Sequence, residues 1–573
     1  MAVVRVFALK CRRVTLTLVL IWLSCYRLCA QTVPVGMPVL DEYFRRAQLN
    51  GKLDSSISFT VRPLFPTAES PTKNQLSDSA LSADSRWISW NGIKSFKEGR
   101  AKVQMLPVTW EQTYTSRHPY GWNDGSMVPA RGYQYRLSAG IFAKYGPLSI
   151  QLRPEFVRAE NKGFEGFNTE HADIIWRYYY NLYLNQSDIP ERFGDNSFES
   201  VSWGQSSIRV SFDPVSVGIS NENLWWGPGR RNSLLMSNSS PGFKHLTLNT
   251  TRPVRTPVGS FEGQIVAGRL ENSGYPPPEP NRTANGLFLD SSKRDDWRYL
   301  SGIILTYRPK WTPGLFLGFS RAFQMYGPDL ERKIGDYLPF LQPFQKKNTG
   351  EYFRERDQLV SLFARYLLPE SKAEVYFEYG FNDHSEDLRD FLLDPEHSRA
   401  YLVGFSKLWS LSRKDELIQA NLEFTQLSQG ASSLLREAGS WYVHGRIRQG
   451  YTNKGQVIGA GIGPGSNLQS FSISWNRKLK GIGLQFERLV HNNDFYNTAW
   501  AHNKDFRKRW VDLSASANAE WDYKNLLINA RASVIRSLNY QYWLIDRPWE
   551  GIYFQSGHDV FNFQGQLGIT YRF

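Results

Sequence analysis

Aromatic and charged side chains occur together in three parts of the chain, and this combination suits the binding of sugars. Aromatic rings pack on the apolar C–H faces of sugars, and Arg pairs with acidic sugar substituents, often through two hydrogen bonds. The candidate residues are Trp225, Trp226, Arg230 and Arg231; Asp383, His384, His397 and Arg399; and Tyr496, Trp500, His502, Lys504, Arg507 and Arg509. Weak contacts along a repeating polysaccharide add by multivalency, so no single site needs high affinity.

Each group also has a simpler explanation. Trp225 and Trp226 precede Gly-Pro-Gly at 227–229, so they fit the support of a tight bend. The basic run at 504–509 fits a solvated patch or one that faces lipopolysaccharide. Both interpretations stay open on the sequence alone.

The acidic and histidine-containing group also invites a chemical interpretation. Asp383, His384, Asp390 and His397 include ligand types that zinc accepts, and Glu378 with Asp383 fits an acid and base pair. A hydrogen-bonded network that braces a loop explains the same residues. No Gly-Xaa-Ser-Xaa-Gly elbow or phosphate-binding loop occurs in a strand–helix context. We therefore expect no enzyme, no cofactor and no metal.

The first thirty residues are built unlike the rest. Arg5, Lys10, Arg12 and Arg13 precede an apolar run from Val14 to Leu23, and Ala30 precedes Gln31. This pattern predicts a signal peptide over residues 1–30. All three cysteines, Cys11, Cys25 and Cys29, fall in that segment, so disulfides, cysteine catalysis and Cys-ligated zinc are not expected in the exported chain.

The net charge of the exported chain limits the classes of molecule that it is expected to bind. The expected signal peptide holds five basic and no acidic residues, so its removal lowers the formal charge from +14 to +9. An exported basic protein does not meet chromosomal DNA. We therefore expect acidic polysaccharide, outer-membrane lipid and lipopolysaccharide as partners, and no nucleic acid.

The elements that must position these residues are strands. Near the C-terminus Phe561, Phe563, Leu567, Ile569, Tyr571 and Phe573 are spaced by polar residues. The same period of two recurs at 374–381, 418–425, 471–475 and 512–521, and it predicts strands with one apolar and one polar face. No segment of the exported chain offers the roughly 18 consecutive apolar residues of a spanning helix.

The connections between strands favour a barrel over a soluble sandwich. Short turns are predicted at 146–147, 213–214, 309–314, 369–372, 410–416, 476–481 and 524–525. Long polar loops are predicted at 117–131, 326–356, 383–399, 428–440, 491–508 and 543–558. Short turns at one end and long loops at the other are typical of outer-membrane barrels, as are many aromatic residues at the membrane interfaces. We predict an all-β, antiparallel barrel of roughly 18 to 20 strands.

A small helical element is predicted before the barrel. Leu40, Tyr43, Phe44 and Ala47 have helical spacing, and Gly51 marks an end. We assign residues 31–54 to a short periplasmic helical element and residues 55–573 to the barrel, with its first strand at Ser56–Val61.

Four motifs combine aromatic, glycine and polar residues in a way that an alternating strand pattern does not require. They are Pro119-Tyr-Gly-Trp-Asn-Asp-Gly125, Asn223-Leu-Trp-Trp-Gly-Pro-Gly229, Glu378-Tyr-Gly-Phe-Asn-Asp-His384, and Gln449-Gly-Tyr-Thr-Asn-Lys-Gly-Gln456 with Gly463-Pro-Gly-Ser-Asn467. At these residues the chain resembles the capsule assembly Wzi family, in its Bacteroidetes-type form. The resemblance implies an eighteen-stranded outer-membrane barrel with a small periplasmic helical element and a lumen obstructed by inward-folded loops.

The resemblance also implies a lectin that holds exported capsular polysaccharide at the cell surface. A diffusion channel or polysaccharide conduit is the alternative, because the same strand pattern serves an open pore. An outer-membrane enzyme is a third and weaker hypothesis. The sequence does not separate them, because they differ in the lumen.

Overall fold

The computed structural model describes residues 32–65, 94–96, 101–331, 333–341, 356–382, 388–413, 415–430, 433, 438–500, 505–545 and 558–573. The expected signal peptide lies outside the described residues, as do Asp383, His384, His502 and Lys504. Among the described residues, no helix is long and apolar enough to cross a membrane.

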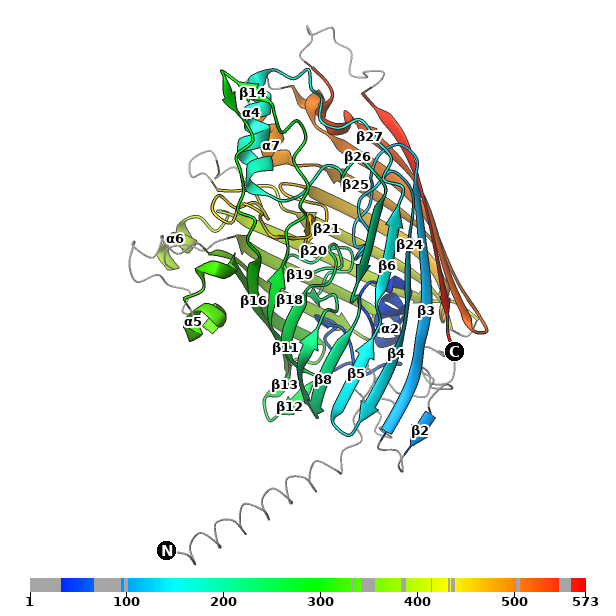
Figure 1. The fold of residues 1–573 in the computed structure, drawn as a ribbon. Coiled ribbons are helices and arrows are strands. Elements are labelled where there is room, and N and C mark those ends of the chain that lie inside the picture. Colours follow the sequence, from blue (N-terminus) through cyan, green and yellow to red (C-terminus); the bar gives the residue numbers. More distant parts are fainter. Residues whose placement is uncertain are drawn as a thin grey trace, which may run out of the picture.

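Eighteen antiparallel strands of the described residues close into a barrel (Figure 1). Each strand pairs with the next in sequence, and β28 closes the ring on β3, with Gln564 opposite Thr115. β5 and β6 together form one interrupted strand, as do β7 and β8. The segments are β3 (Ala101–Thr115), β4 (Gly132–Tyr145), β5 (Leu148–Leu152), β6 (Glu155–Ala159), β7 (Phe198–Ser202), β8 (Ser207–Phe212), β9 (Val215–Ser220), β11 (Lys244–Thr250), β13 (Gly259–Leu270), β16 (Arg298–Pro309), β17 (Leu315–Tyr326), β18 (Asp357–Leu368), β19 (Ala373–Asn382), β20 (Arg399–Ser410), β21 (Glu416–Gln426), β24 (Asn467–Arg477), β25 (Lys480–Val490), β26 (Val511–Tyr523), β27 (Leu526–Leu538) and β28 (Val560–Tyr571).

Smaller elements accompany the barrel. β2 (Lys94–Phe96) pairs with β3, and β12 (Val254–Thr256) with β13. Two-stranded sheets join β1 (Val61–Arg62) to β10 (Trp225–Trp226), β14 (Thr283–Ala284) to β15 (Leu287–Phe288), and β22 (Thr452–Asn453) to β23 (Gln456–Val457). The helices are α2 (Pro38–Leu49), α4 (Asp173–Leu182), α5 (Ile334–Tyr337), α6 (Leu388–Leu393) and α7 (Asn493–Ala499), with 3₁₀ turns η1 (Leu184–Gln186), η2 (Gly327–Asp329), η3 (Pro339–Leu341), η6 (Phe506–Lys508) and η7 (Tyr540–Tyr542).

The connections confirm the expected alternation. All seven predicted turns join neighbouring strands at one end of the barrel, which we call the turn end. The long connections lie at the other end, which we call the loop end. The turn end faces the periplasm in outer-membrane barrels.

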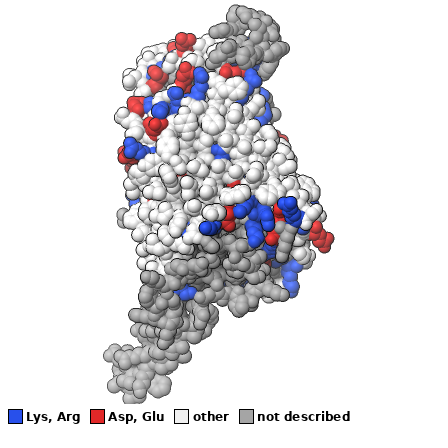
Figure 2. Space-filling model, turned by 90° about the vertical axis from the view of Figure 1, so that its right-hand side faces the viewer, with Lys and Arg blue, Asp and Glu red and all other residues white. Residues whose placement is uncertain are grey.

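The two faces of the wall differ as predicted. In β21, Leu422 and Phe424 face outward and are 36% and 39% exposed, whereas Glu423 and Thr425, which alternate with them, face the lumen. Outward aromatic residues gather near the turns, among them Tyr145, Trp311, Trp409, Trp521 and Tyr571. They correspond to the aromatic girdle of a membrane barrel. Figure 2 shows a broad band of this face that is nearly free of charged residues, with charges gathered toward its ends.

The helix α2 confirms the predicted helical element and lies inside the barrel, toward the turn end (Figure 1). Its Leu40 and Phe44 are fully buried and pack in one cluster with Leu479 and Leu527 of the barrel. The predicted first strand at Ser56–Val61 is wrong. Its apolar residues alternate because Ile57 and Phe59 pack in the same cluster, and the barrel begins at β3.

Two long loops fold into the lumen and fill it. Residues 221–243 follow β9, and residues 438–466 precede β24; we call these two segments the plug. Leu234 of the first and Trp441 of the second share one buried cluster with the inward-facing wall residues Val266, Leu300 and Ile304. The inward-folded loops therefore obstruct the lumen, as the family resemblance implied.

Candidate functional site

Trp225 and Trp226 lie inside the lumen, where they form β10 against β1. Trp226 is completely buried, and its Nε1 donates a hydrogen bond of 2.9 Å to Gln264. Trp225 is 4% exposed and packs under the guanidinium of Arg62, 4.7 Å from its ring centre. Neither ring offers a free face to a sugar. Both therefore support the plug, consistent with the simpler interpretation of this motif.

Arg230 belongs to a buried ionic network that ties three parts of the molecule together. Its Nη2 lies 2.6 Å from Glu374 of β19, and it also pairs with Glu42 of α2. Glu374 accepts from two further guanidiniums, Arg45 of α2 at 3.0 Å and Arg365 of β18 at 2.6 Å. We call these five residues the Glu374 network. It fixes helix, plug and wall to one another through charge-assisted hydrogen bonds.

Arg231 reaches a different part of the wall, on β25, which is the fourth strand along from β19. It pairs with Glu487 of β25 through Nε at 2.7 Å, and its guanidinium lies 4.1 Å from the ring centre of Trp122. The backbone N–H groups of Arg230, Arg231 and Asn232 all donate to Glu423. The two neighbouring arginines therefore brace the plug against two different strands of the wall, β19 and β25.

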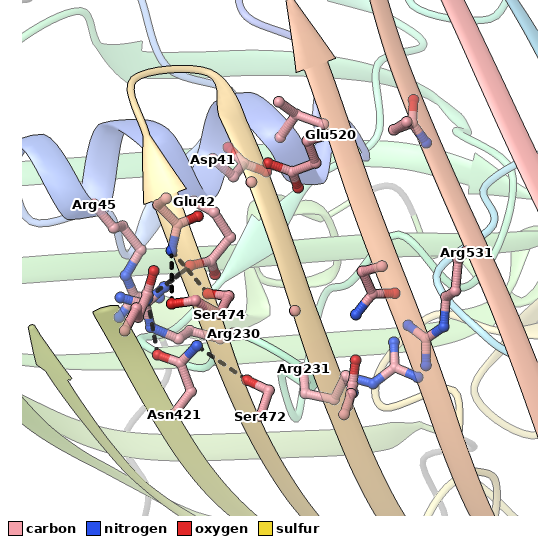
Figure 3. A pocket seen from close by; sticks show the side chains of 18 of the residues that line it. Asp41, Glu42, Arg45, Arg230, Arg231, Asn421, Ser472, Ser474, Glu520 and Arg531 are labelled. Atoms are coloured by element: carbon pink, nitrogen blue, oxygen red, sulfur yellow. Dashed lines mark hydrogen bonds and ion pairs between the residues drawn. The ribbon is translucent and has the colours of Figure 1, made fainter. Parts of the chain in front are cut away.

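A cavity of about 330 Å³ lies between α2, the plug and the wall, on the turn-end side of the plug. Figure 3 shows ten of its lining residues: Asp41, Glu42, Arg45, Arg230, Arg231, Asn421, Ser472, Ser474, Glu520 and Arg531. Asn421 donates to Ser472 at 3.2 Å, and Gln419 donates to Glu42 at 3.1 Å. This surface can hydrogen-bond water or a polar ligand. Arg45, Arg230 and Arg231 are already engaged with carboxylates, so these guanidiniums are poorly placed to capture an acidic sugar.

A second, smaller cavity of about 110 Å³ lies on the loop-end side of the plug. We call it the crevice, and its lining includes Tyr120, Trp122, Asp124, Tyr183, Phe193 and Gln456. Three long loops supply these residues, namely those that follow β3 and β6 and the one that precedes β24. Tyr120 and Tyr183 are half-buried, so part of each ring stays accessible. Burial raises the pKa of Asp124 to about 6. Aromatic faces beside amide and carboxyl groups suit recognition of a sugar.

Trp500 is buried in an aromatic cluster at the loop end. The cluster joins α4 to α7 and contains Phe167, Trp176, Tyr179, Phe495, Trp500 and Tyr542. Trp500 is 3% exposed, and its ring stacks on Tyr542 at 5.5 Å. Arg507 lies nearby in sequence and pairs with Asp505 through two hydrogen bonds of 2.8 Å.

The remaining candidates lie at the loop after β19. Arg399 begins β20, where its guanidinium lies 3.4 Å from Glu396 and 5.4 Å from the ring centre of Tyr401. The backbone N–H of His397 donates to Asp394 at 3.2 Å. Within the described ranges, no three His, Cys, Asp or Glu residues stand close enough to hold a metal ion. Asp383 and His384 fall outside those ranges.

The structure therefore distributes the predicted residues over three places. Trp225, Trp226, Arg230 and Arg231 meet in the lumen, whereas Trp500 and Arg399 belong to separate loop-end regions. The sequence reasoning missed Glu374, Arg365 and Arg45, which complete the lumen network. The available signal was a charged residue on the polar face of a predicted strand. That signal does not reveal which side chain from the helix or the plug will pair with it inside the lumen. The crevice was not predicted from the sequence either, although Tyr120 and Trp122 belong to the motif at 119–125.

Comparisons with known proteins agree with this architecture. The family model of the capsule assembly protein Wzi matches residues 112–540, more than half of the chain. The structure of Wzi from Escherichia coli, described as a carbohydrate-binding β-barrel involved in group 1 capsule assembly, is similar over 95% of this chain and 100% of that one. The TM-score is 0.58 and the sequence identity 13%.

More distant barrels are also found. OccAB2 from Acinetobacter baumannii covers 83% of this chain and 98% of its own, with a TM-score of 0.39 and 11% identity. No curated protein matches the chain in sequence. The match to the family model over most of the barrel decides the assignment: this chain belongs to the capsule assembly protein Wzi family.

Proposed function

We propose that this outer-membrane barrel binds exported capsular polysaccharide at its loop end and holds it on the cell surface, without catalysing a reaction. Membership of the Wzi family supports this proposal. The observation that carries it is the packed plug, in which Leu234, Leu235 and Trp441 are completely buried. A filled lumen favours a surface that binds a glycan over a channel that conducts one.

The crevice is the proposed contact for the sugar. Its small volume suits a single sugar unit or substituent of a longer chain that remains outside the barrel. We retain His397, Arg399 and Arg507, with Asp383 and His384, as further contacts at the loop end for an acidic polysaccharide. Trp225, Trp226, Arg230, Arg231 and Trp500 act indirectly, because they hold the loops that shape the binding surface.

A deletion strain tests the function. Cell-bound polysaccharide is measured against polysaccharide shed into the medium, with total synthesis determined alongside. The proposal expects unchanged total synthesis and a transfer from cells to medium. Unchanged cell-bound polysaccharide would contradict it.

Two variants test the crevice within that strain. Tyr120→Ala and Tyr183→Ala are expected to reduce retention while the barrel still folds. Phe288→Ala is the matched control, because Phe288 lies on the β14–β15 hairpin and is 70% exposed. Equal retention in all three variants would exclude the crevice as the contact.

Conductance tests the channel alternative. Purified protein in a planar bilayer is expected to show no stable conductance, because the plug segments pack against the wall. A steady single-channel current would favour the channel instead. We further propose that residues 1–30 direct export and that the turn end faces the periplasm.

A further inference from the structure

Three polar residues face outward from the barrel wall, where a membrane barrel normally presents apolar side chains. Ser301 of β16, Arg321 of β17 and Gln358 of β18 lie on the outer face, because their strand neighbours Leu300, Ala322 and Leu359 belong to the lumen core. An arginine that faces lipid destabilises a barrel, most strongly near the middle of the bilayer.

These outward polar residues are nevertheless buried. Ser301, Arg321 and Gln358 are 0%, 4% and 6% exposed. Arg321 donates to Gln358 at 2.7 Å and to the carbonyl oxygen of Phe340 at 3.4 Å. Its position in β17 places it roughly 15 Å along the barrel axis from the turn end, within an outer band that is roughly 25 Å tall.

The cover comes from residues 333–341 of the loop after β17. This segment carries α5 and η3, and η3 contacts the outer face of β16 and β17. The hydroxyl of the outward-facing Tyr299 donates to the carbonyl oxygen of Tyr337 at 2.8 Å. The segment therefore folds back along the outside of the barrel.

A second segment is attached in the same way. Residues 388–398 carry α6, and the hydroxyl of the outward-facing Tyr379 donates to the carbonyl oxygen of Pro395 at 2.7 Å. Figure 1 shows α5 and α6 outside the barrel wall, on the same side of the molecule. We call residues 333–341 and 388–398 together the flap.

The outer surface of the flap carries large exposed apolar side chains, beside the exposed charged residues Lys333, Arg389 and Glu396. Ile334 and Leu341 of the first segment are 79% and 67% exposed, and Leu392 and Leu393 of the second are both 68% exposed. These values exceed the 54% exposure of Leu362, an ordinary outward residue of β18. Four such side chains in water would form an unfavourable patch.

We propose that the flap inserts into the hydrocarbon layer of the outer leaflet and binds lipid acyl chains. The flap continues the apolar outer band of the barrel, and it replaces lipid over Ser301, Arg321 and Gln358. Its inner side covers these polar groups and accepts a hydrogen bond from Arg321 through the carbonyl oxygen of Phe340, while Ile334, Leu341, Leu392 and Leu393 present apolar surface to the acyl chains. The flap thereby gives the barrel one broadened, lipid-embedded side.

Spin labels at single cysteines test this proposal, because residues 31–573 contain no cysteine. In full-length chains carrying Cys11→Ser, Cys25→Ser and Cys29→Ser, a nitroxide is attached at Leu341→Cys or Leu392→Cys. Leu362→Cys on the barrel wall is the lipid-facing reference, and Phe288→Cys at the loop end is the water-facing reference. The protein is folded into vesicles that contain lipopolysaccharide and phospholipid.

Collision rates with oxygen, which enters lipid, are compared with those of a water-soluble nickel chelate. At positions 341 and 392 we expect an oxygen-to-nickel ratio close to that at 362 and several-fold above that at 288. A ratio like that at 288 would place the flap in water and overturn the proposal. Low collision rates with both reagents would indicate that a protein partner or a second copy covers the flap, and would also overturn it.

Discussion

The Glu374 network and the loop-end aromatic cluster both hold inserted segments in place, but by opposite means. The network joins α2 and the plug to the wall through three guanidiniums around one carboxylate, all within the lumen. The aromatic cluster joins α4 and α7 through packed rings such as Tyr179 and Phe495, whose centres are 5.2 Å apart. Charge fixes the turn-end side of the plug, and apolar packing fixes the loop end.

The difference shows why the residue types expected to bind sugar do not all do so. In the lumen, Arg45, Arg230 and Arg231 are paired with carboxylates. At the loop end, the rings of Trp176 and Trp500 pack against Phe167 and Tyr542. Between these two regions the crevice keeps tyrosine faces that are only half-buried. Tyr183 stacks on Tyr179 of the cluster but stays half-buried. Recognition is therefore expected where a ring keeps part of its surface accessible.

The largest effect is expected from breaking the ionic region with Glu374→Gln. The substitution leaves Arg45, Arg230 and Arg365 without their shared charge inside the lumen. Loss of one partner in a buried network costs about 3–5 kcal/mol, so we expect a large fall in the free energy of unfolding. Urea titration followed by gel mobility of the folded barrel measures it.

Glu199→Gln is the matched control for that variant. Glu199 pairs with Arg158 at 3.3 Å, but both side chains are more than half exposed, and such pairs contribute about 0.2–1 kcal/mol. If the two variants lost similar amounts of the free energy of unfolding, the lumen network would stabilise the barrel no more than a surface ion pair does. The contrast between the ionic region and the aromatic cluster would then fail.

The next largest effect is expected from Trp176→Ala in the aromatic cluster. Trp176 is completely buried and meets Phe167 edge-on at 4.9 Å. Removing a buried tryptophan costs about 3 kcal/mol or more. We expect faster proteolysis of the loops that carry α4 and α7, while the gel mobility of the barrel is retained.

Trp311→Ala serves as its control, because Trp311 lies in a turn and is 70% exposed. If Trp176→Ala unfolds the whole barrel in the same step as Glu374→Gln, the two regions form one cooperative unit. The proposal that charge fixes the turn-end side of the plug while apolar packing independently fixes the loop end would then be wrong.

A smaller effect is expected from pH, through Glu191 beside the aromatic cluster. Its Oε1 accepts from the backbone N–H of Phe167 at 2.8 Å, and burial raises its pKa to about 7. The folded state therefore binds this proton more tightly than the unfolded state. Stability is lost as the pH rises through 7, by about 1 kcal/mol between pH 6.5 and pH 8.

Two neighbouring groups set this choice of pH range. Burial lowers the pKa of His171 to about 4 and raises that of Asp494 only to about 6, so most of both contributions changes below pH 7. The remaining His171 contribution, from the unfolded state that still titrates near its ordinary pKa, increases stability with pH and therefore opposes the slope from Glu191. Proteolysis of the loop end, measured across the range, is expected to speed up with pH in the unaltered chain. Glu191→Gln is expected to flatten the slope, and an unchanged slope would assign it to another group.

The sequence predicted the wall of the barrel well, because a wall strand shows its two environments directly as a period of two. Residues 418–425 predicted β21 with the correct face inward, and the seven turns were found from Gly, Pro and polar breakers. Ser56–Val61 shows where this logic fails. Alternation there records packing against α2, since a segment inside a lumen also has an apolar and a polar side.

The site was harder to predict than the wall for a physical reason. Trp225, Trp226 and Arg230 were candidates for contact with a ligand, but their partners Gln264 and Glu374 lie on strands far away in sequence. Only the folded plug reveals that these groups are already satisfied. Tyr183 could be found only after three separate loops were placed around one cavity.

The smallest effect on stability is expected from Arg507→Gln. This variant tests whether Arg507 serves mainly to hold its loop or to bind the glycan. Arg507 lies at the loop end and forms a two-bonded pair with Asp505, whose pKa it holds below the usual range. The pair involves a short local contact, so its loss is expected to cost less than about 1 kcal/mol. Polysaccharide retention on cells is expected to fall less than in Tyr183→Ala, because Asp505 already accepts hydrogen bonds from the Nε and Nη2 groups of Arg507. A loss of retention as large as in Tyr183→Ala, with folding unchanged, would make Arg507 a main glycan contact and move the centre of recognition from the crevice to the loop that follows β25.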